Sequence, residues 1–346
     1  MNQKHSLSIL GAGAIGCYTG GWLARGDNSV TLIGRPRIIE DIRSSGLHLE
    51  SVSGVRATLK SDSSSNGNLS LSTSSSSLSE SRFILVCVKS AGTEEAAEQI
   101  RSHAPAGAVV VSLQNGLGAA RILKEKLPGF TVLPGMVTFN VVYRGKGLFQ
   151  QSTSGPIVIQ DPGGEIADNL QKAFEGPGLE LEFEKDMESV QWSKLLLNLN
   201  NGINALAGIP IRSMLSQRGY RRIIAACIQE AIDLYKVAGI RIVRLGKIVP
   251  QLAPFILRLP DFLFFRVAST MIRIDPSAMT SLAQDLMAGK KTEIDFLNGE
   301  IVRLARSRGR EAPINESIVR LIHAAEQDGG GSPEWSPEEL AGKMEL

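Results

Sequence analysis

The stretch Leu7-Ser8-Ile9-Leu10-Gly11-Ala12-Gly13-Ala14-Ile15-Gly16-Cys17 decides how the first half of the chain folds. A short apolar strand runs into glycines spaced G-x-G-x-x-G, and a segment that can form a helix follows at once. The first glycine permits a tight turn, the second leaves bare backbone for a pyrophosphate, and the third lets helix and strand pack closely. The helix would point its free N–H groups at the phosphates. The pattern predicts a dinucleotide site, and the alternative is an ordinary glycine-containing turn. If a dinucleotide binds here, the residues that contact it would be Gly11, Gly13, Ala14, Ile15 and Gly16.

Length and composition exclude several classes of protein. The 346 residues suggest two domains, and a hydrophobic content of 43% suffices for packed cores. The chain has no long uncharged apolar run, which argues against a membrane span. Its net charge of +2 is spread along the sequence, so we expect no nucleic-acid partner. The three cysteines are far apart in apolar surroundings, so we expect them to be buried free thiols. Because the four histidines are also scattered, we expect no metal site. The first strand begins too early for a signal peptide, so we expect a cytoplasmic protein.

The residue after the second predicted strand indicates which dinucleotide binds. Ser29 to Ile33 forms that strand, and its end would face the adenosine ribose, where an acidic residue binds a free 2′-hydroxyl. The sequence has Gly34-Arg35-Pro36-Arg37 there instead. Arginine pairs with phosphate through a bidentate fork, whereas a carboxylate would repel it. We therefore expect Arg35 to bind the 2′-phosphate of NADP(H), the alternative being a solvated surface arginine.

Two further apolar runs predict buried parallel strands that end in polar residues. Phe83 to Val88 is followed by Lys89, and Val109 to Leu113 is followed closely by Asn115. Open α/β sheets bind ligands at the carboxyl ends of their strands. Lys89 and Asn115 should therefore reach the rim that holds the glycine loop, unless they are merely solvated residues at strand ends.

Changes in composition mark the predicted domains of this α/β protein. Between Ser61 and Ser81, 12 of 21 residues are serine, which predicts a mobile surface loop (61–81) because such a tract buries little apolar surface. Strand propensity from Thr131 to Gln160 could extend the sheet, and from about Lys185 the pattern is almost wholly helical. We predict a Rossmann-type NADP-binding domain over 1–185, an all-helical substrate and catalytic domain over 186–328, and a flexible tail over 329–346.

Polar residues stand out in the first long helical segment, Met187 to Leu206. Lys194 and Asn198 are four residues apart and share a helix face, with Asn201 nearly on the same side. Their neighbours are mostly leucines, so the lysine either extends its ammonium to solvent or is held there for a purpose. Burial lowers the pKa of a lysine, which makes it a competent proton donor near neutral pH.

A second helical segment, Ser277 to Ser307, also carries polar residues. Ser281 and Asp285 share a face one turn apart, and Glu293 immediately precedes an apolar stripe. Spacing alone leaves a surface or capping role open for each of them. The stripe consists of Ile294, Leu297, Ile301 and Leu304.

Taken together, these motifs resemble the ketopantoate reductase (2-dehydropantoate 2-reductase) family over roughly Leu7 to His323. The glycine loop is generic to dinucleotide binders, whereas the helical motifs are specific in their order and spacing. The matching stretches are Gly11-Ala12-Gly13-Ala14-Ile15-Gly16, Val86-Cys87-Val88-Lys89, Gln114-Asn115-Gly116-Leu117-Gly118, Trp192-Ser193-Lys194-Leu195-Leu196-Leu197-Asn198, Ser281-Leu282-Ala283-Gln284-Asp285 and Lys291-Thr292-Glu293-Ile294-Asp295.

The resemblance implies hydride transfer from NADPH to the keto carbon of 2-dehydropantoate, which makes pantoate for pantothenate and coenzyme A synthesis. By the same resemblance, Lys194 is the general acid that protonates the developing alkoxide, and Glu293 helps to orient substrate and lysine. The remaining implied contacts are Asn198 and Ser281 with the substrate hydroxyl and carboxylate, and Lys89 and Asn115 near the nicotinamide end.

One departure from the family concerns a second asparagine, whose usual place is occupied here by Gly202. Asn201, which we include among the substrate-binding residues, or Asn204 could substitute for it. Other branched 2-oxo acids stay open as substrates, and so does a non-catalytic NADP(H)-sensing role. A sensor would need neither Lys194 nor Glu293. The apolar helical domain could support a homodimer.

Overall fold

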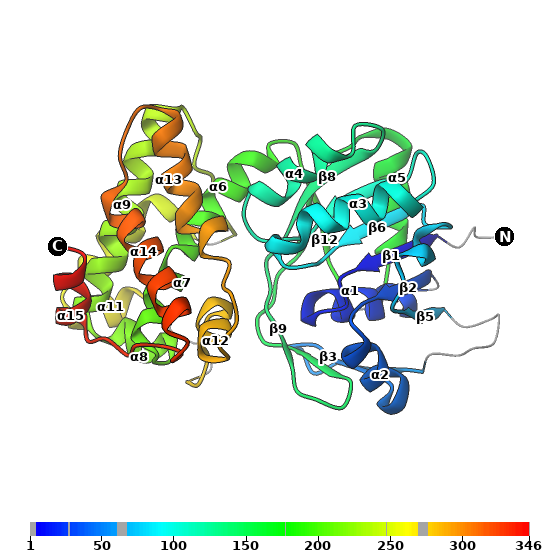
Figure 1. The fold of residues 1–346 in the computed structure, drawn as a ribbon, viewed down its shortest axis with the longest axis horizontal. Helices are drawn as coiled ribbons and strands as arrows, with labels where there is room; N and C mark the ends of the chain where they lie inside the picture. The colour runs from blue at the N-terminus through cyan, green and yellow to red at the C-terminus, as the bar shows by residue number, and fades with distance from the viewer. Residues whose placement is uncertain are drawn as a thin grey trace. The chain divides into compact units, whose positions relative to one another are not determined.

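The computed structural model describes residues 5–26, 28–60, 68–176, 178–246, 248–268 and 276–345, and the chain divides after Met187 into two compact units (Figure 1). Unit 1 is Met1–Met187 and unit 2 is Glu188–Leu346. Among the described residues, every strand of a sheet lies in unit 1, and the regular structure of unit 2 is helical. These findings confirm the predicted fold class, a Rossmann-type domain followed by a helical domain.

Unit 1 is built on an eight-stranded sheet in the order β12-β11-β8-β7-β6-β1-β2-β5. Neighbouring strands run parallel except β8 and β11, which are antiparallel. The strands are β1 (Ser6–Leu10), β2 (Ser29–Ile33), β5 (Leu69–Ser72), β6 (Phe83–Val86), β7 (Val109–Ser112), β8 (Thr131–Val137), β11 (Ile157–Gln160) and β12 (Leu181–Glu184).

Helices cover both faces of this sheet, which explains why its central strands are almost continuously apolar. Successive residues of a strand alternate between the two cores. Phe83 and Leu85 pack in the core with α1, whereas Ile84 and Val86 pack in the core with α3. The helices of unit 1 are α1 (Ala14–Arg25), α2 (Pro36–Ser45), α3 (Thr93–His103), α4 (Gly118–Lys126) and α5 (Gly164–Ala173), with short 3₁₀ turns η1 (Ser75–Leu78) and η2 (Ser90–Gly92).

A second sheet of four strands takes up some of the strands that we expected to extend the main sheet. Its order is β4-β3-β10-β9, with β3 (Leu47–Glu50), β4 (Arg56–Leu59), β9 (Val141–Tyr143) and β10 (Leu148–Gln151). The strands β3 and β10 pair in parallel although about 100 residues separate them. The extension of the main sheet by β8 and β11 agrees with the expectation, but its extension by β9 and β10 does not.

The serine-rich segment differs from the predicted mobile loop. Residues 61–67 lie outside the described ranges, but the rest forms β5, which pairs in parallel with β2, and η1. Leu69 and Leu78 are buried and anchor the two elements. The serine hydroxyls form hydrogen bonds with one another, as between Ser77 and Ser72 (Oγ–Oγ 2.7 Å). The polar side chains therefore find hydrogen-bond partners within the same segment. For residues 68–81, the structure differs from the predicted loop because that prediction weighed composition above these two leucines.

Unit 2 is a helical domain in which α9 is the longest helix. The expected helix over Ser277 to Ser307 is broken into α12, η4 and α13, and Gly289, which follows the C-cap residue of α12, adopts a positive φ of 63°. The elements are α6 (Met187–Asn198), α7 (Asn200–Ala207), α8 (Ile211–Ser216), α9 (Arg218–Ala238), η3 (Pro250–Leu252), α10 (Ala253–Arg258), α11 (Asp261–Val267), α12 (Ser281–Met287), η4 (Ile294–Phe296), α13 (Asn298–Ser307), α14 (Pro313–Asp328) and α15 (Pro337–Lys343).

The C-terminal segment 329–346, expected to be a flexible tail, contains a packed helix. Ser336 and Glu339 form a capping box at the start of α15, and Leu340 is fully buried. Just before the helix, the Tyr220 hydroxyl on α9 donates to the carbonyl of Trp335 at 2.6 Å. The expectation rested on the Gly, Pro and Glu content, which says nothing about these contacts.

Candidate active site

The glycine loop of unit 1 is fastened between the carboxyl ends of β2 and β6. The amides of Gly11 and Ala12 both donate to the carbonyl of Ile33, at 2.9 and 3.0 Å. Gly11 has a φ of 111°, and a Cβ on it would lie 2.5 Å from the backbone nitrogen of Val88. Only glycine fits this position, because both the dihedral angle and the close approach to β6 exclude a side chain.

The other two glycines of the loop have opposite surroundings. A Cβ on Gly16 would overlap the carbonyl oxygen of Gly11, so this glycine allows α1 to pack against the turn. A Cβ on Gly13 would meet no atom within 4 Å. Gly13 is also the N-cap of α1, where no side chain caps the helix and no acidic residue occupies the first turn. The first amides of a helix lack partners within the helix itself, so beside open space they suit an anionic group.

Arg35 follows directly on the segment that holds this loop. It is the N-cap of α2 and is exposed, as is Arg37. The preceding Gly34 donates its amide to the carbonyl of Ser72 at the end of β5, at 3.0 Å. The end of β2 is therefore fixed from both sides, and the exposed Arg35 follows it directly.

Lys89 and Asn115 are exposed residues at the carboxyl ends of the neighbouring strands β6 and β7. A chain of buried hydrogen bonds links the two loops. Gln114 donates from Nε2 to Oγ1 of Thr93 at 2.8 Å, and Thr93 donates to the carbonyl of Ser90 at 2.7 Å. Our sequence reasoning missed this connection, although Gln114 directly precedes Asn115 in the quoted motif.

Lys194 of unit 2 lies on α6 among buried leucines. Its side chain is only partly accessible, and burial lowers its pKa to about 8. Asn198 ends α6, Leu199 separates the helices, and Asn201 lies in the first turn of α7; both asparagines are partly buried. A half-buried ammonium with a pKa near neutrality can act as an acid without an extreme change of pH.

The helix α7 connects to the elements that carry Ser281 and Glu293. Asn204 donates from Nδ2 to the carbonyl of Ile209 at 2.7 Å and accepts the Thr280 amide at 3.0 Å. Thr280 caps α12, and the exposed Ser281 is the first residue of that helix. Both polar ends of the Asn204 side chain therefore bind backbone groups.

Gly202 is closely packed, so the structure has no room for a side chain at this position. A Cβ on Gly202 would lie 2.5 Å from Cγ2 of Ile318 and 3.2 Å from Cδ1 of Ile294. Ile294 directly follows Glu293. The residue after Glu293 therefore packs against α7 at Gly202.

A cluster of ionisable groups clamps the turn on both sides of Glu293. The Thr292 amide donates to Oε1 of Glu326 at 2.7 Å. The imidazole of His323 bridges Oε2 of Glu326 and Oδ1 of Asp295, each at 3.1 Å. Burial alone would lower the pKa of His323, but its hydrogen bonds to the two carboxylates raise it. Nothing in the spacing of these residues along the sequence indicated the cluster.

Comparison with known families identifies the chain. The family model described as "Ketopantoate reductase PanE/ApbA" matches residues 7–164, and the model of its C-terminal domain matches residues 186–326. The chain belongs to the ketopantoate reductase family. As a member, it is an oxidoreductase of the type that acts on a CH–OH group, and the resemblance seen in the sequence is confirmed.

Individual relatives match nearly the whole chain. The 2-dehydropantoate 2-reductase of Pyrococcus horikoshii is 30% identical over 94% of this chain and 99% of its own length. The crystal structure of a PanE/ApbA family ketopantoate reductase from Ralstonia eutropha has a TM-score of 0.78 at 29% identity, covering 94% of this chain and 99% of that one. A D-mandelate dehydrogenase solved with NADH and anilino(oxo)acetate has a TM-score of 0.74 at 22% identity, with 94% and 99% coverage, and shows a shared fold.

In the described ranges of the chain, no group of three or more His, Cys, Asp or Glu side chains could hold a metal ion. No helix of the described part of the chain is long and apolar enough to cross a membrane.

Proposed function

We propose that this chain reduces 2-dehydropantoate to pantoate with NADPH, in the synthesis of pantothenate and coenzyme A, and that Lys194 is the general acid. The burial of Lys194, which lowers its pKa to about 8, carries the proposal. A purely structural lysine gains nothing from burial, since desolvation penalises its charged form. A proton donor benefits, because its pKa approaches the working pH.

The residues of unit 1 fit a dinucleotide. The open space beside Gly13 and the uncapped start of α1 suit the pyrophosphate, and the exposed Arg35 suits a 2′-phosphate. The D-mandelate dehydrogenase neighbour was solved with NADH, which supports a nicotinamide dinucleotide in general. The arginine after β2, in place of an acid, favours NADPH. Lys89 and Asn115 would lie near the nicotinamide end, and bound NADPH would supply the hydride.

The side chains of unit 2 would act on the substrate. When the keto carbon accepts a hydride, negative charge develops on its oxygen. The Lys194 ammonium would stabilise that charge and then donate its proton. Glu293, on its clamped turn, would orient substrate and lysine. The polar groups left to bind the substrate hydroxyl and carboxylate are Asn198, Asn201 and Ser281.

The test is NADPH oxidation by the purified enzyme with 2-dehydropantoate and a panel of other 2-oxo acids. We expect the highest kcat/KM with 2-dehydropantoate, and a loss of about 10²- to 10⁴-fold in kcat for Lys194→Ala. The matched control Lys290→Ala, at an exposed lysine, should retain full activity. Equal turnover by Lys194→Ala would refute the general-acid role. A better substrate elsewhere in the panel would replace 2-dehydropantoate, and tight NADPH binding without any turnover would indicate a sensor.

A further inference from the structure

A cavity of about 390 Å³ opens in unit 2 beside the C-terminal half of α9. It is lined by that helix and by the segment 240–251 that follows it, and none of the lining residues is among those proposed for the reaction. At roughly 30 Å³ for each water molecule, the volume is that of about 13 waters, which is enough for a small organic molecule. The apolar lining is Ile232, Tyr235, Ile240 and Ile242, and the polar lining is Gln229, Lys236 and Gln251.

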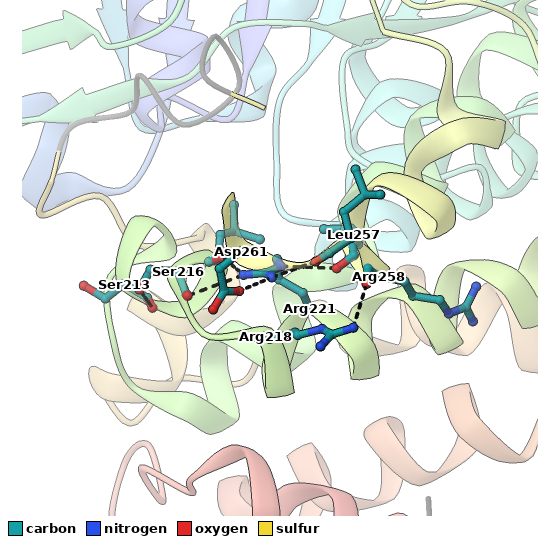
Figure 2. A network of polar contacts seen from close by, with 9 residues as sticks. Ser213, Ser216, Arg218, Arg221, Leu257, Arg258 and Asp261 are labelled. Atoms are coloured by element: carbon teal, nitrogen blue, oxygen red, sulfur yellow. Dashed lines mark hydrogen bonds and ion pairs between the residues drawn. The ribbon is translucent and has the colours of Figure 1, made fainter. Parts of the chain in front are cut away.

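The walls of this cavity are held in place by hydrogen bonds. Gln251 of η3 donates from Nε2 to the carbonyl of Ile242 at 2.9 Å, which ties one end of the segment to the other. The helix α10, which follows η3 directly, is fastened to α9 by the fully buried Arg221 (Figure 2). The Arg221 guanidinium donates to the carbonyls of Leu257 and Leu259 at 3.2 and 3.1 Å. A preformed cavity loses little conformational freedom when it is filled.

Both walls of the cavity are hydrogen-bonded to the turn of α6 that carries Lys194. The hydroxyl of Tyr235, whose side chain is fully buried, donates to the carbonyl of Trp192 at 3.1 Å. From the other wall, the amide of Val243 donates to Oγ of the fully buried Ser193 at 2.8 Å. A molecule packed against these two walls would therefore act on the part of α6 that carries Lys194.

The charges around the cavity favour a carboxylate on its ligand. Lys236 forms an ion pair with Asp233 at 2.8 Å, but the two side chains are 70 and 57% exposed. Such a pair contributes little, so the ammonium can turn to another anion at small cost. The exposed Arg241 stands in the sequence between the lining residues Ile240 and Ile242. The two cations and the one carboxylate leave a net positive charge, which attracts an anion.

We infer that this cavity is a second ligand site, for a small monocarboxylic acid with an apolar body, and that its occupation lowers kcat through α6. The apolar body would pack on the isoleucines and the Tyr235 ring, and the carboxylate would meet Lys236. Catalytic geometry tolerates little displacement, since about 1 Å can cost roughly 100-fold in rate. The part of the inference that concerns kcat rests on the proposed role of Lys194, whereas the binding itself does not.

Calorimetry of the purified full chain with phenylpropionate tests the binding. We expect a Kd of about 0.1 to 1 mM, the affinity of a small ligand in a matching cavity. Phenylpropanol lacks the carboxylate and should bind about 2- to 5-fold more weakly, which is the range of one exposed ion pair. Lys236→Met should weaken phenylpropionate by the same factor and leave phenylpropanol unchanged. The matched control Lys172→Met, at an exposed lysine of unit 1, should bind both compounds like the wild type.

The variant Ile240→Trp separates this cavity from the site proposed for the reaction. Ile240 is half-buried, so the larger indole can take up part of the cavity, and the affinity for phenylpropionate should fall more than about 10-fold. With saturating NADPH and the best 2-oxo acid of the panel, phenylpropionate should lower kcat of the wild type at least about 2-fold. Ile240→Trp should remove this inhibition.

Three results would overturn the inference. The first is a wild type that binds no phenylpropionate at up to about 10 mM. The second is equal binding by the wild type and by Ile240→Trp with an unchanged melting temperature, which would place the acid in another site. If Ile240→Trp does not fold, unchanged affinities of Lys236→Met for both compounds decide in the same way. The third is binding at the cavity without any change in kcat, which would separate the cavity from α6. If the enzyme turns over no 2-oxo acid, the proposed function fails, and calorimetry alone still decides the binding.

Discussion

Replacing Lys194 by methionine should make the protein less active and more stable at the same time. Methionine keeps most of the apolar volume of the side chain but removes the ammonium, which is held among leucines of α6. The reaction loses its proton donor, so kcat should fall by about 10²- to 10⁴-fold. The folded state loses a group that is poorly accommodated when charged, so the free energy of unfolding should rise.

The size of the stability gain follows from the pKa. Burial lowers the pKa of Lys194 from 10.5 to about 8. At 1.36 kcal/mol per pKa unit, the charged form is penalised by about 3 kcal/mol in the folded state. Below pH 8 the lysine is protonated in both states, and the full penalty is present. Between about pH 8 and 10.5 only the unfolded chain binds the proton, so wild-type stability rises with pH and the advantage of Lys194→Met disappears.

Urea unfolding at pH 7 and at pH 9.5 measures this advantage directly. Lys290→Met, at an exposed lysine, is the matched control and should differ little from wild type at either pH. The reasoning is refuted if Lys194→Met is no more stable than wild type at pH 7, or if its advantage is the same at both pH values. In the wild type, kcat should fall as pH rises through about 8, because the ammonium is lost.

Four further variants test the remaining parts of the site. Arg35→Asp should weaken NADPH binding by about 10- to 100-fold and favour NADH, because a carboxylate repels the 2′-phosphate; equal cofactor preference would contradict that role. Gly13→Ala should fold normally and bind NADPH weakly, whereas Gly16→Ala should lower the melting temperature, since only the second Cβ overlaps backbone. The raised pKa of His323 means that its protonation stabilises the folded wild type below about pH 6.5, and that this stabilisation is lost as pH rises through the raised pKa. His323→Gln should lack this contribution to the free energy of unfolding. If the free energies of unfolding of the two proteins ran parallel against pH, the result would argue against the clamp.

The parts of the fold that could be predicted from sequence are those with local signals. The strand β6 was predictable because four consecutive apolar residues fit a strand covered on both faces, and the glycine loop because its spacing imposes a turn. The stripe from Ile294 to Leu304 was also correctly placed in the core, although the helix expected to carry it is broken.

The parts that could not be predicted depend on partners far away in the chain. The second sheet needs β3 to meet β10, and β5 needs the edge of β2. In the candidate site, Asn204 bonds to Thr280, and His323 to Asp295, across dozens of residues. Hydrogen bonds between residues far apart in the chain produce no periodic pattern and no change of composition in the sequence. Lys194 and Glu293 could therefore be singled out from the sequence, whereas the residues that hold their helices and turns in place could not.

The chain of hydrogen bonds through Gln114 and Thr93 has a consequence for how this enzyme can vary. Because it couples the loop of Lys89 to the loop of Asn115, a change at Gln114 is felt at both. Substitutions at Gln114 and Thr93 should therefore show strong epistasis, with the double variant less damaging than the two single effects would suggest. Selection for altered loops at the carboxyl ends of β6 and β7 should therefore change Gln114 and Thr93 together. Libraries that randomise one of the two loops at a time would miss the combinations of residues that restore the hydrogen bond.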